Sequence, residues 1–102
     1  FRRVLFPIFN MIVKTISITV SGLVQGVWFR KHTCDAALNA GLAGIVMNKP
    51  DGSVYIEATG SEPQLNQLIE WCHTGSPKSK VMSVKVGNFD EVKLFEGFVI
   101  AG

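Results

Sequence analysis

Cysteine is scarce in this sequence, and its scarcity argues against several kinds of site. The chain has 2 cysteines, Cys34 and Cys72, which form no C-x-x-C pair and have no histidine and aspartate at metal-ligand spacing. We therefore expect no bound metal. Both cysteines fall on or near the apolar faces of predicted helices, so we interpret them as buried, reduced thiols rather than a disulfide pair. This interpretation indicates a reducing compartment, and we expect a cytoplasmic protein.

An excess of charge of one sign is also absent. The 10 basic residues include Arg2 and Arg3, so the chain from residue 11 onward has 8 basic and 8 acidic side chains. Such a balance lacks the electrostatic footprint of a nucleic-acid-binding protein, and no basic stripe interleaved with aromatic residues replaces it. No apolar run is long enough to span a membrane. We expect neither nucleic acid nor a membrane as partner, and RNA binding is the third hypothesis for the function.

The first ten residues differ from the rest of the chain. They join Arg2 and Arg3 to a short apolar stretch that Pro7 interrupts, and no small-residue cleavage site of a secretory signal follows. We interpret residues 1–10 as an artificial or upstream-translated extension outside the fold, with a tail packed on the domain as the competing interpretation. Residues 11–102 are expected to form one domain with a single core.

Strand and helix patterns alternate through that domain. Residues 14–20 alternate β-branched apolar and polar side chains, as a half-buried strand does. Apolar residues at helical spacing predict one helix that Gly41 ends and another that begins at a capping box on Ser61. The Asp51-Gly52 pair predicts a tight turn between two strands. The expected order is strand 14–20, helix 29–40, strands 45–48 and 53–59, a helix that the capping box at Ser61 starts and Gly75 stops, and strands 80–87 and 95–100, with a bulge in strand 80–87.

This order predicts an α+β fold. A βαββαβ sequence with a possible final strand makes a ferredoxin-like sandwich, in which an antiparallel sheet carries both helices on one face and leaves the other face more solvated. Proteins of this fold bind metals, RNA or regulatory ligands, so the fold alone implies no function.

The most informative segment is the loop between the first strand and the first helix. It reads Ser21-Gly22-Leu23-Val24-Gln25-Gly26-Val27-Trp28-Phe29-Arg30. Gly22 and Gly26 can adopt backbone angles that turn successive N–H groups inward, and the start of a helix adds its positive end. Arg30 offers a planar guanidinium for oxyanion oxygens. The segment predicts an anion site, with phosphate as the leading ligand.

Two segments resemble the signatures of the acylphosphatase family. Residues 20–30 contain V-Q-G-V-x-F-R, which closes a phosphate-binding loop in that family. Residues 44–54, read as Gly44-Ile45-Val46-Met47-Asn48-Lys49-Pro50-Asp51-Gly52-Ser53-Val54, resemble its second signature, in which an asparagine follows a glycine by four residues and precedes a tight turn. The resemblance extends from Lys14 to Ile100. It implies an enzyme that hydrolyses acyl phosphates to a carboxylate and inorganic phosphate, without a cofactor.

The resemblance also implies roles for individual residues. Arg30 matches the family's phosphate-binding arginine, and Asn48 matches the asparagine that orients the attacking water. The phosphate-binding main-chain amides are those of Leu23, Val24, Gln25, Gly26, Val27 and Trp28. Gly22, Phe29 and Thr33 are expected to support the site. Gln25 is either an exposed loop residue or a hydrogen-bonding brace, and Thr33 is core-facing, bonded to the backbone or able to orient the site.

Physical chemistry supports these roles. An acyl phosphate leaves as a carboxylate, which is a stable anion at neutral pH, so no general acid is required. The charge that develops on the phosphoryl oxygens needs positioning and electrostatic stabilisation, which Arg30 and the amides can supply. We expect a monomer that takes a small acyl phosphate substrate and is inhibited by its product, inorganic phosphate. The alternative is a non-catalytic domain that binds phosphate or carbamoyl phosphate, or that has a regulatory role.

Overall fold

The computed structural model describes residues 12–102, and the predictions made for residues 1–10 lie outside this range. The described chain forms two helices and five strands in the order expected. They are β1 (Lys14–Leu23), α1 (Phe29–Asn39), β2 (Ala43–Asn48), β3 (Val54–Gly60), α2 (Glu62–Thr74), β4 (Lys80–Asn88) and β5 (Phe98–Ile100).

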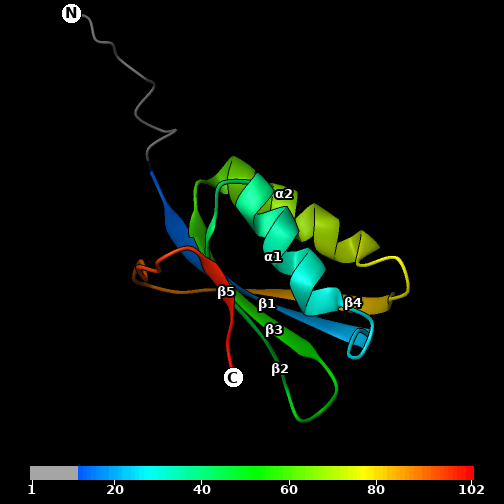
Figure 1. Ribbon diagram of the computed structural model, residues 1–102. Coiled ribbons are helices and arrows are strands. Elements are labelled where there is room, and N and C mark those ends of the chain that lie inside the picture. The colour runs from blue at the N-terminus through cyan, green and yellow to red at the C-terminus, as the bar shows by residue number, and fades with distance from the viewer. Residues whose placement is uncertain (1–11) are drawn as a thin grey trace, which may run out of the picture.

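The strands form one sheet in the order β4-β1-β3-β2-β5, and both helices cover the same face of it (Figure 1). The alternation in β1 explains this arrangement, because Ile16, Ile18 and Val20 point to the helices and are buried. In α2 the apolar residues recur at helical spacing and complete the core with Leu65, Leu68 and Cys72. The predicted α+β sandwich with both helices on one face is confirmed.

One part of the fold prediction is wrong, since the sheet is not antiparallel throughout. β5 pairs with β2 in parallel, with Gly44 opposite Phe98. The direction follows from topology: β4 is antiparallel to β1, and the chain turns back after β4, so β5 runs in the same direction as β1 and β2. The connection, residues 89–97, crosses one end of the sheet to reach the far edge. It replaces the first half of the expected strand 95–100.

The end of β1 also differs from expectation. The strand continues past residue 20 to Leu23, because β4 pairs with it as far as Lys80. The register shifts between Ser21 and Gly22, which face Ser83 and Val81, so Met82 is the extra residue of a bulge. The bulge expected in strand 80–87 is confirmed. The loop predicted to bind an anion is correspondingly shorter, running from residue 24 to residue 28.

The capping box expected at Ser61 is present. The main-chain N–H of Gln64 donates to Ser61 Oγ at 3.4 Å, and the N–H of Ser61 donates to Gln64 Oε1 at 2.9 Å. These bonds satisfy donors that would otherwise lack acceptors at the start of α2. α2 therefore begins where its sequence predicts.

The connection 89–97 is fastened to the open face of the sheet. Lys93 Nζ donates to Glu57 Oε1 at 2.7 Å, and Tyr55 Oη donates to Glu57 Oε2 at 2.6 Å. The main chain of Lys93 also bonds two threonines, since its N–H donates to Thr15 Oγ1 at 2.8 Å and its carbonyl accepts from Thr59 Oγ1 at 2.7 Å. We call the connection 89–97 the strap. It leads directly into β5.

Candidate active site

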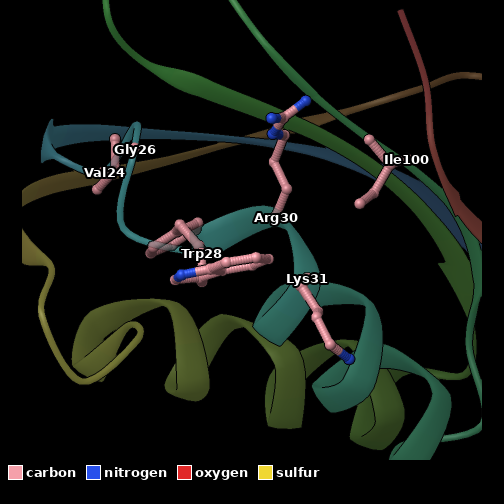
Figure 2. Close-up of a pocket in the computed structure, with 7 residues that line it drawn as sticks. Val24, Gly26, Trp28, Arg30, Lys31 and Ile100 are labelled. Carbon is pink, nitrogen blue, oxygen red and sulfur yellow. The ribbon is translucent and has the colours of Figure 1, made fainter.

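A pocket opens where the loop 24–28 meets the first turn of α1 and the end of β5. Its volume is about 430 Å³, and it is lined by Val24, Gly26, Trp28, Phe29, Arg30, Lys31 and Ile100. Figure 2 shows the loop on one side of Arg30 and Ile100 on the other. Segments that are distant in the sequence therefore meet at the residue that the sequence marks as the anion ligand.

The backbone of the loop is shaped for an anion. Gly26 and Trp28 both lie in the left-handed region, with φ of 75° and 62°. No main-chain N–H from Val24 to Lys31 donates a hydrogen bond to a main-chain carbonyl within residues 12–102. Left-handed residues at alternate positions turn successive N–H groups toward one side, and such concavities bind anions. The amides from Val24 to Lys31 are thus available as donors.

Charge at the start of α1 favours the same ligand. The first turn contains Arg30 and Lys31 and no acidic residue, so no carboxylate opposes the positive end of the helix. Arg30 is half-buried and forms no ion pair with any residue of the described part of the chain. Its guanidinium is directed away from α2, whereas the Lys31 side chain points to the opposite side (Figure 2). The Lys31 amine lies 3.5 Å from Asp35 Oδ2. Arg30 is the cation available to a ligand in the pocket.

Hydrogen bonds hold the loop in place from two sides. Gln25 Nε2 donates to the carbonyls of Lys49 and Ser53, at 2.8 and 2.9 Å, and so ties the loop to the turn between β2 and β3. On the other side Ser76 Oγ donates to the carbonyl of Val27 at 3.0 Å. The sequence left the role of Gln25 open between an exposed residue and a brace. The structure shows a brace.

Buried side chains complete this support. Val24 and Phe29 are each 1% exposed, and the Phe29 ring packs on that of Trp71 with 5.2 Å between centroids. Donors fixed in this way need little reorganisation when a charged ligand arrives, which is the condition for strong electrostatic stabilisation.

Asn48 is the last residue of β2, immediately before the turn that Gln25 braces. Its Oδ1 atom is buried and accepts no hydrogen bond from another residue of the described chain. A buried acceptor without a partner costs roughly 1–3 kcal/mol, so a donor such as a water O–H suits this position. Asn48 is not among the lining residues of the pocket. Its convergence with Arg30 therefore stays a prediction.

The remaining predicted residues occupy different places. Thr33 is fully buried, and its hydroxyl donates to the carbonyl of Phe29 at 2.8 Å, so it stabilises α1 from within the core. Leu23 ends β1 opposite Lys80 and is outside the pocket lining, as are Gln25 and Val27. Gly22 has a φ of 128°, and a Cβ there would strike the carbonyl oxygen of Lys80. Glycine at position 22 thus permits the bulged pairing that precedes the loop.

Comparison with known proteins bears on this arrangement. Residues 16–100 match the model of the acylphosphatase family, which is described as "Acylphosphatase". The chain belongs to the acylphosphatase family. It is 47% identical to the acylphosphatase of Haloquadratum walsbyi over 79% of this chain and 86% of that protein. It is 40% identical to the acylphosphatase of Shewanella amazonensis over 86% of this chain and 97% of that protein.

Solved structures agree with this acylphosphatase assignment. The acylphosphatase of Bacillus subtilis is similar with a TM-score of 0.84 and 36% identity, covering 89% of this chain and all 100% of that one. Full-length HypF in its phosphate- and nucleotide-bound form has a TM-score of 0.77 and 30% identity over 88% of this chain but only 12% of its own length. The chain is thus an enzyme of a hydrolase family, and the family supports acyl phosphate hydrolysis as its activity.

Two further residues of the candidate site, Ser76 and Ile100, were not predicted from the sequence. Gly75-Ser76-Pro77 is part of the family resemblance, but nothing in the sequence links the Ser76 hydroxyl to a carbonyl 49 positions earlier. Ile100 reaches the pocket only because β5 pairs with β2. Both contacts depend on how the elements are placed in space rather than on any local pattern.

The two cysteines lie outside the pocket lining. Cys34 and Cys72 are both free thiols, but only Cys72 is buried as expected, whereas Cys34 is half-buried. Burial raises the pKa of Cys72 to about 12, which keeps it protonated and unreactive. Across residues 12–102, no three side chains of His, Cys, Asp or Glu gather in a way that could hold a metal ion. Within the same range, the helices are too short or too polar to cross a bilayer.

Proposed function

We propose that the chain hydrolyses acyl phosphates by direct attack of water on a phosphoryl group bound by Arg30 and by the main-chain amides of the loop. The observation that carries this proposal is the run of N–H groups from Val24 to Lys31 without main-chain acceptors, next to an arginine that forms no ion pair in the described chain. Val24, Gly26, Trp28 and Arg30, which carry donors of both kinds, line one pocket. They suit a ligand with several negatively charged oxygens.

Binding the phosphoryl group also stabilises the transition state. During transfer its negative charge spreads over the non-bridging oxygens while the attacking and leaving oxygens lie roughly in line. Arg30 can donate two parallel hydrogen bonds to such oxygens, and the amides add fixed partial charges. The braces at Gln25 and Ser76 keep these donors oriented before substrate arrives.

Asn48 provides the acceptor for the attacking water in this proposal. Its Oδ1 holds one O–H of the water while the water oxygen attacks phosphorus. The bond between phosphorus and the acyl oxygen breaks, and the electron pair leaves with the carboxylate. The amide of Asn48 is not basic near neutral pH, so the proton of the water passes to an oxygen of the substrate phosphate. The products are a carboxylate and dihydrogen phosphate, and neither a general acid nor a metal is required.

The product inhibits the enzyme in the same proposal, because inorganic phosphate satisfies the same donors. The pocket is lined by residues of a single chain, so we further propose that the enzyme acts as a monomer. The alternative is a domain that binds phosphate or carbamoyl phosphate without turnover.

The rate of benzoyl phosphate hydrolysis without added metal separates the two functions. We expect Arg30→Ala to lose about 10³-fold or more in kcat/KM together with phosphate inhibition, since it removes both a charge and donors. Asn48→Ala should lose kcat steeply and keep the inhibition constant of phosphate, because only the water is misplaced. Lys85→Ala and Asn88→Ala, both on the exposed edge strand β4, are the matched controls.

Each outcome has a distinct meaning. A folded wild-type chain that binds phosphate without turning over benzoyl phosphate would favour the binding-domain function. Full activity in Asn48→Ala would refute the role of Asn48 and leave that of Arg30 standing.

A further inference from the structure

The pocket has a second side that phosphate binding does not use. Beyond Arg30, Lys31 and the loop amides, its lining consists of the apolar side chains of Val24, Trp28, Phe29 and Ile100. Its volume of about 430 Å³ lies in the range of small-molecule sites, which is larger than a phosphate ion requires. Polar donors thus lie beside apolar surface within a single pocket.

Trp28 is the most unusual residue on this apolar side. It is 74% exposed although it lines a pocket, so its ring contributes little to the core. Its φ of 62° is uncommon for a residue other than glycine, asparagine or aspartate. It is also the N-cap of α1 and makes no side-chain capping bond there. Neither the local backbone nor the helix benefits from tryptophan, and an outlier of this kind suggests a role toward a ligand.

Ile100 lines the same pocket and comes from β5, whereas Trp28 comes from the loop. It lies on β5 opposite Val46 and is 49% exposed. Figure 2 shows Ile100 and the Trp28 ring on different sides of the Arg30 side chain. A substrate held at its phosphate end by Arg30 would therefore meet apolar side chains on either side.

Charge restricts what this surface accepts. Lys31 is the one other charged residue of the lining, and its amine is turned to Asp35 rather than to Arg30. No lining residue is acidic, so nothing in the pocket favours a cationic substituent. An uncharged apolar group fits these side chains best.

We propose that Trp28 and Ile100 bind the acyl group and make the enzyme select aromatic carboxyl phosphates over small ones such as acetyl phosphate. The proposal rests on the proposed function, since it assigns the other half of the same substrate. Trp28 is a specificity-determining residue through its ring, in addition to the amide that it contributes to the loop. Stacking of an aryl ring on the indole supplies the preference, and Ile100 covers its other side.

The test compares kcat/KM for benzoyl phosphate with that for acetyl phosphate. We expect Trp28→Ala to lower this ratio about 5- to 10-fold, the range of an aromatic pair with some lost burial. Ile100→Ala should lower this ratio about 2- to 5-fold, because isoleucine buries less apolar area than tryptophan. Trp28→Phe should keep most of the ratio because it keeps a ring. Leu94→Ala, a substitution of a 90% exposed apolar residue in the strap, is the control.

Binding of two inert analogues provides a readout that needs no turnover. Phenethylphosphonate and propylphosphonate place the same number of atoms between phosphorus and the ring or methyl group as benzoyl and acetyl phosphate do. We expect the phenethyl compound to bind more tightly to the wild type, and Trp28→Ala to remove most of that advantage. Equal affinities in the wild type, or an advantage that survives in both Trp28→Ala and Ile100→Ala, would overturn the proposal.

These outcomes are distinguishable from failure of the proposed function. If the chain hydrolyses neither acyl phosphate but binds phenethylphosphonate more tightly through Trp28, the apolar subsite is supported and the proposed hydrolysis is refuted. If the chain hydrolyses both acyl phosphates and the variants leave the ratio of their kcat/KM values unchanged, the proposed hydrolysis stands and the apolar subsite is refuted.

Discussion

At the residue scale, the two halves of the candidate site depend on Gln25. This one amide group donates to two carbonyls on either side of the turn that follows Asn48, and it belongs to the loop that precedes Arg30. The proposed reaction requires a water and a phosphoryl group in fixed relative positions. Misplacement by about 1 Å can cost on the order of 100-fold in rate. The side chain of Gln25 thus acts by positioning, because in this proposal only its main-chain N–H contacts the phosphate and neither group contacts the water.

We therefore expect Gln25→Ala to lower kcat by about 10- to 100-fold while the inhibition constant of phosphate changes little. The loop keeps its Ser76 anchor, so Arg30 and the amides still bind the anion. Steady-state kinetics with benzoyl phosphate and phosphate inhibition measure both quantities. Gln67→Ala, on the exposed face of α2, is the control. A parallel loss of kcat and phosphate binding would mean that Gln25 maintains the loop itself rather than its position relative to Asn48.

Gly22 supports a second prediction at the same scale. Its Cβ would collide with the main chain of β4, at Lys80 and Met82, and its φ of 128° already disfavours a side chain. We expect Gly22→Ala to lower the free energy of unfolding by about 2 kcal/mol or more in urea denaturation. Gly52→Ala is the matched control, because Gly52 has a φ of 94° and open space around it. Similar losses in the two variants would show that backbone angle alone, without the collision, explains the requirement.

At the scale of elements, much of the fold was predictable because its signals are local. Alternation marks β1, the capping box starts α2, and the Asp51-Gly52 pair marks the hairpin turn. The direction of β5 and the course of the strap were not predictable, because they depend on which sheet edge the chain reaches after β4. In the site, Arg30 and the loop were recognisable from sequence, whereas the anchors at Ser76 and the carbonyl of Lys49 are long-range contacts.

The strap is held to the sheet by the Glu57 carboxylate, whose charge depends on pH. Burial raises the pKa of Glu57, but hydrogen bonds from Lys93 and Tyr55 outweigh it and hold that pKa below the ordinary value of a glutamate. A carboxyl with a lowered folded-state pKa stabilises the fold above its unfolded pKa, and the stabilisation is lost as pH falls through the folded pKa. Glu57 therefore fastens the strap at neutral pH and releases part of that stabilisation in acid.

We expect Glu57→Gln to cost about 1 kcal/mol of unfolding free energy at pH 7, a modest value because the Lys93 side chain is 44% exposed. The difference from wild type should shrink as the pH is lowered below about 4, the ordinary pKa of a glutamate. Urea denaturation at several pH values measures it, with Glu70→Gln on the exposed side of α2 as control. A cost that stays constant down to acid pH would show that the charge of Glu57 does not contribute.

For the whole molecule, ligand binding and folding are linked. The pocket proposed to bind phosphate is assembled from the loop, the first turn of α1 and the end of β5, so an unfolded chain has no such pocket. A ligand that binds only the folded state stabilises it by about 2.7 kcal/mol at 100 times its Kd. For a domain of this size, that free energy corresponds to a rise in Tm of roughly 10–20 °C. Inorganic phosphate should therefore raise the Tm of the wild type in proportion to the logarithm of its concentration.

Phosphate also stabilises proteins as an excluded salt, and the variants separate this effect from site binding. The excluded-salt effect acts equally on every variant, whereas the site effect requires Arg30. We expect calorimetry in phosphate to show the full rise for wild type and Asn48→Ala, and only a small rise for Arg30→Ala. Sodium chloride at the same ionic strength corrects for screening. An equal rise in Arg30→Ala would place phosphate elsewhere, whereas a smaller rise in Asn48→Ala would make Asn48 a ligand of the phosphate rather than of the water.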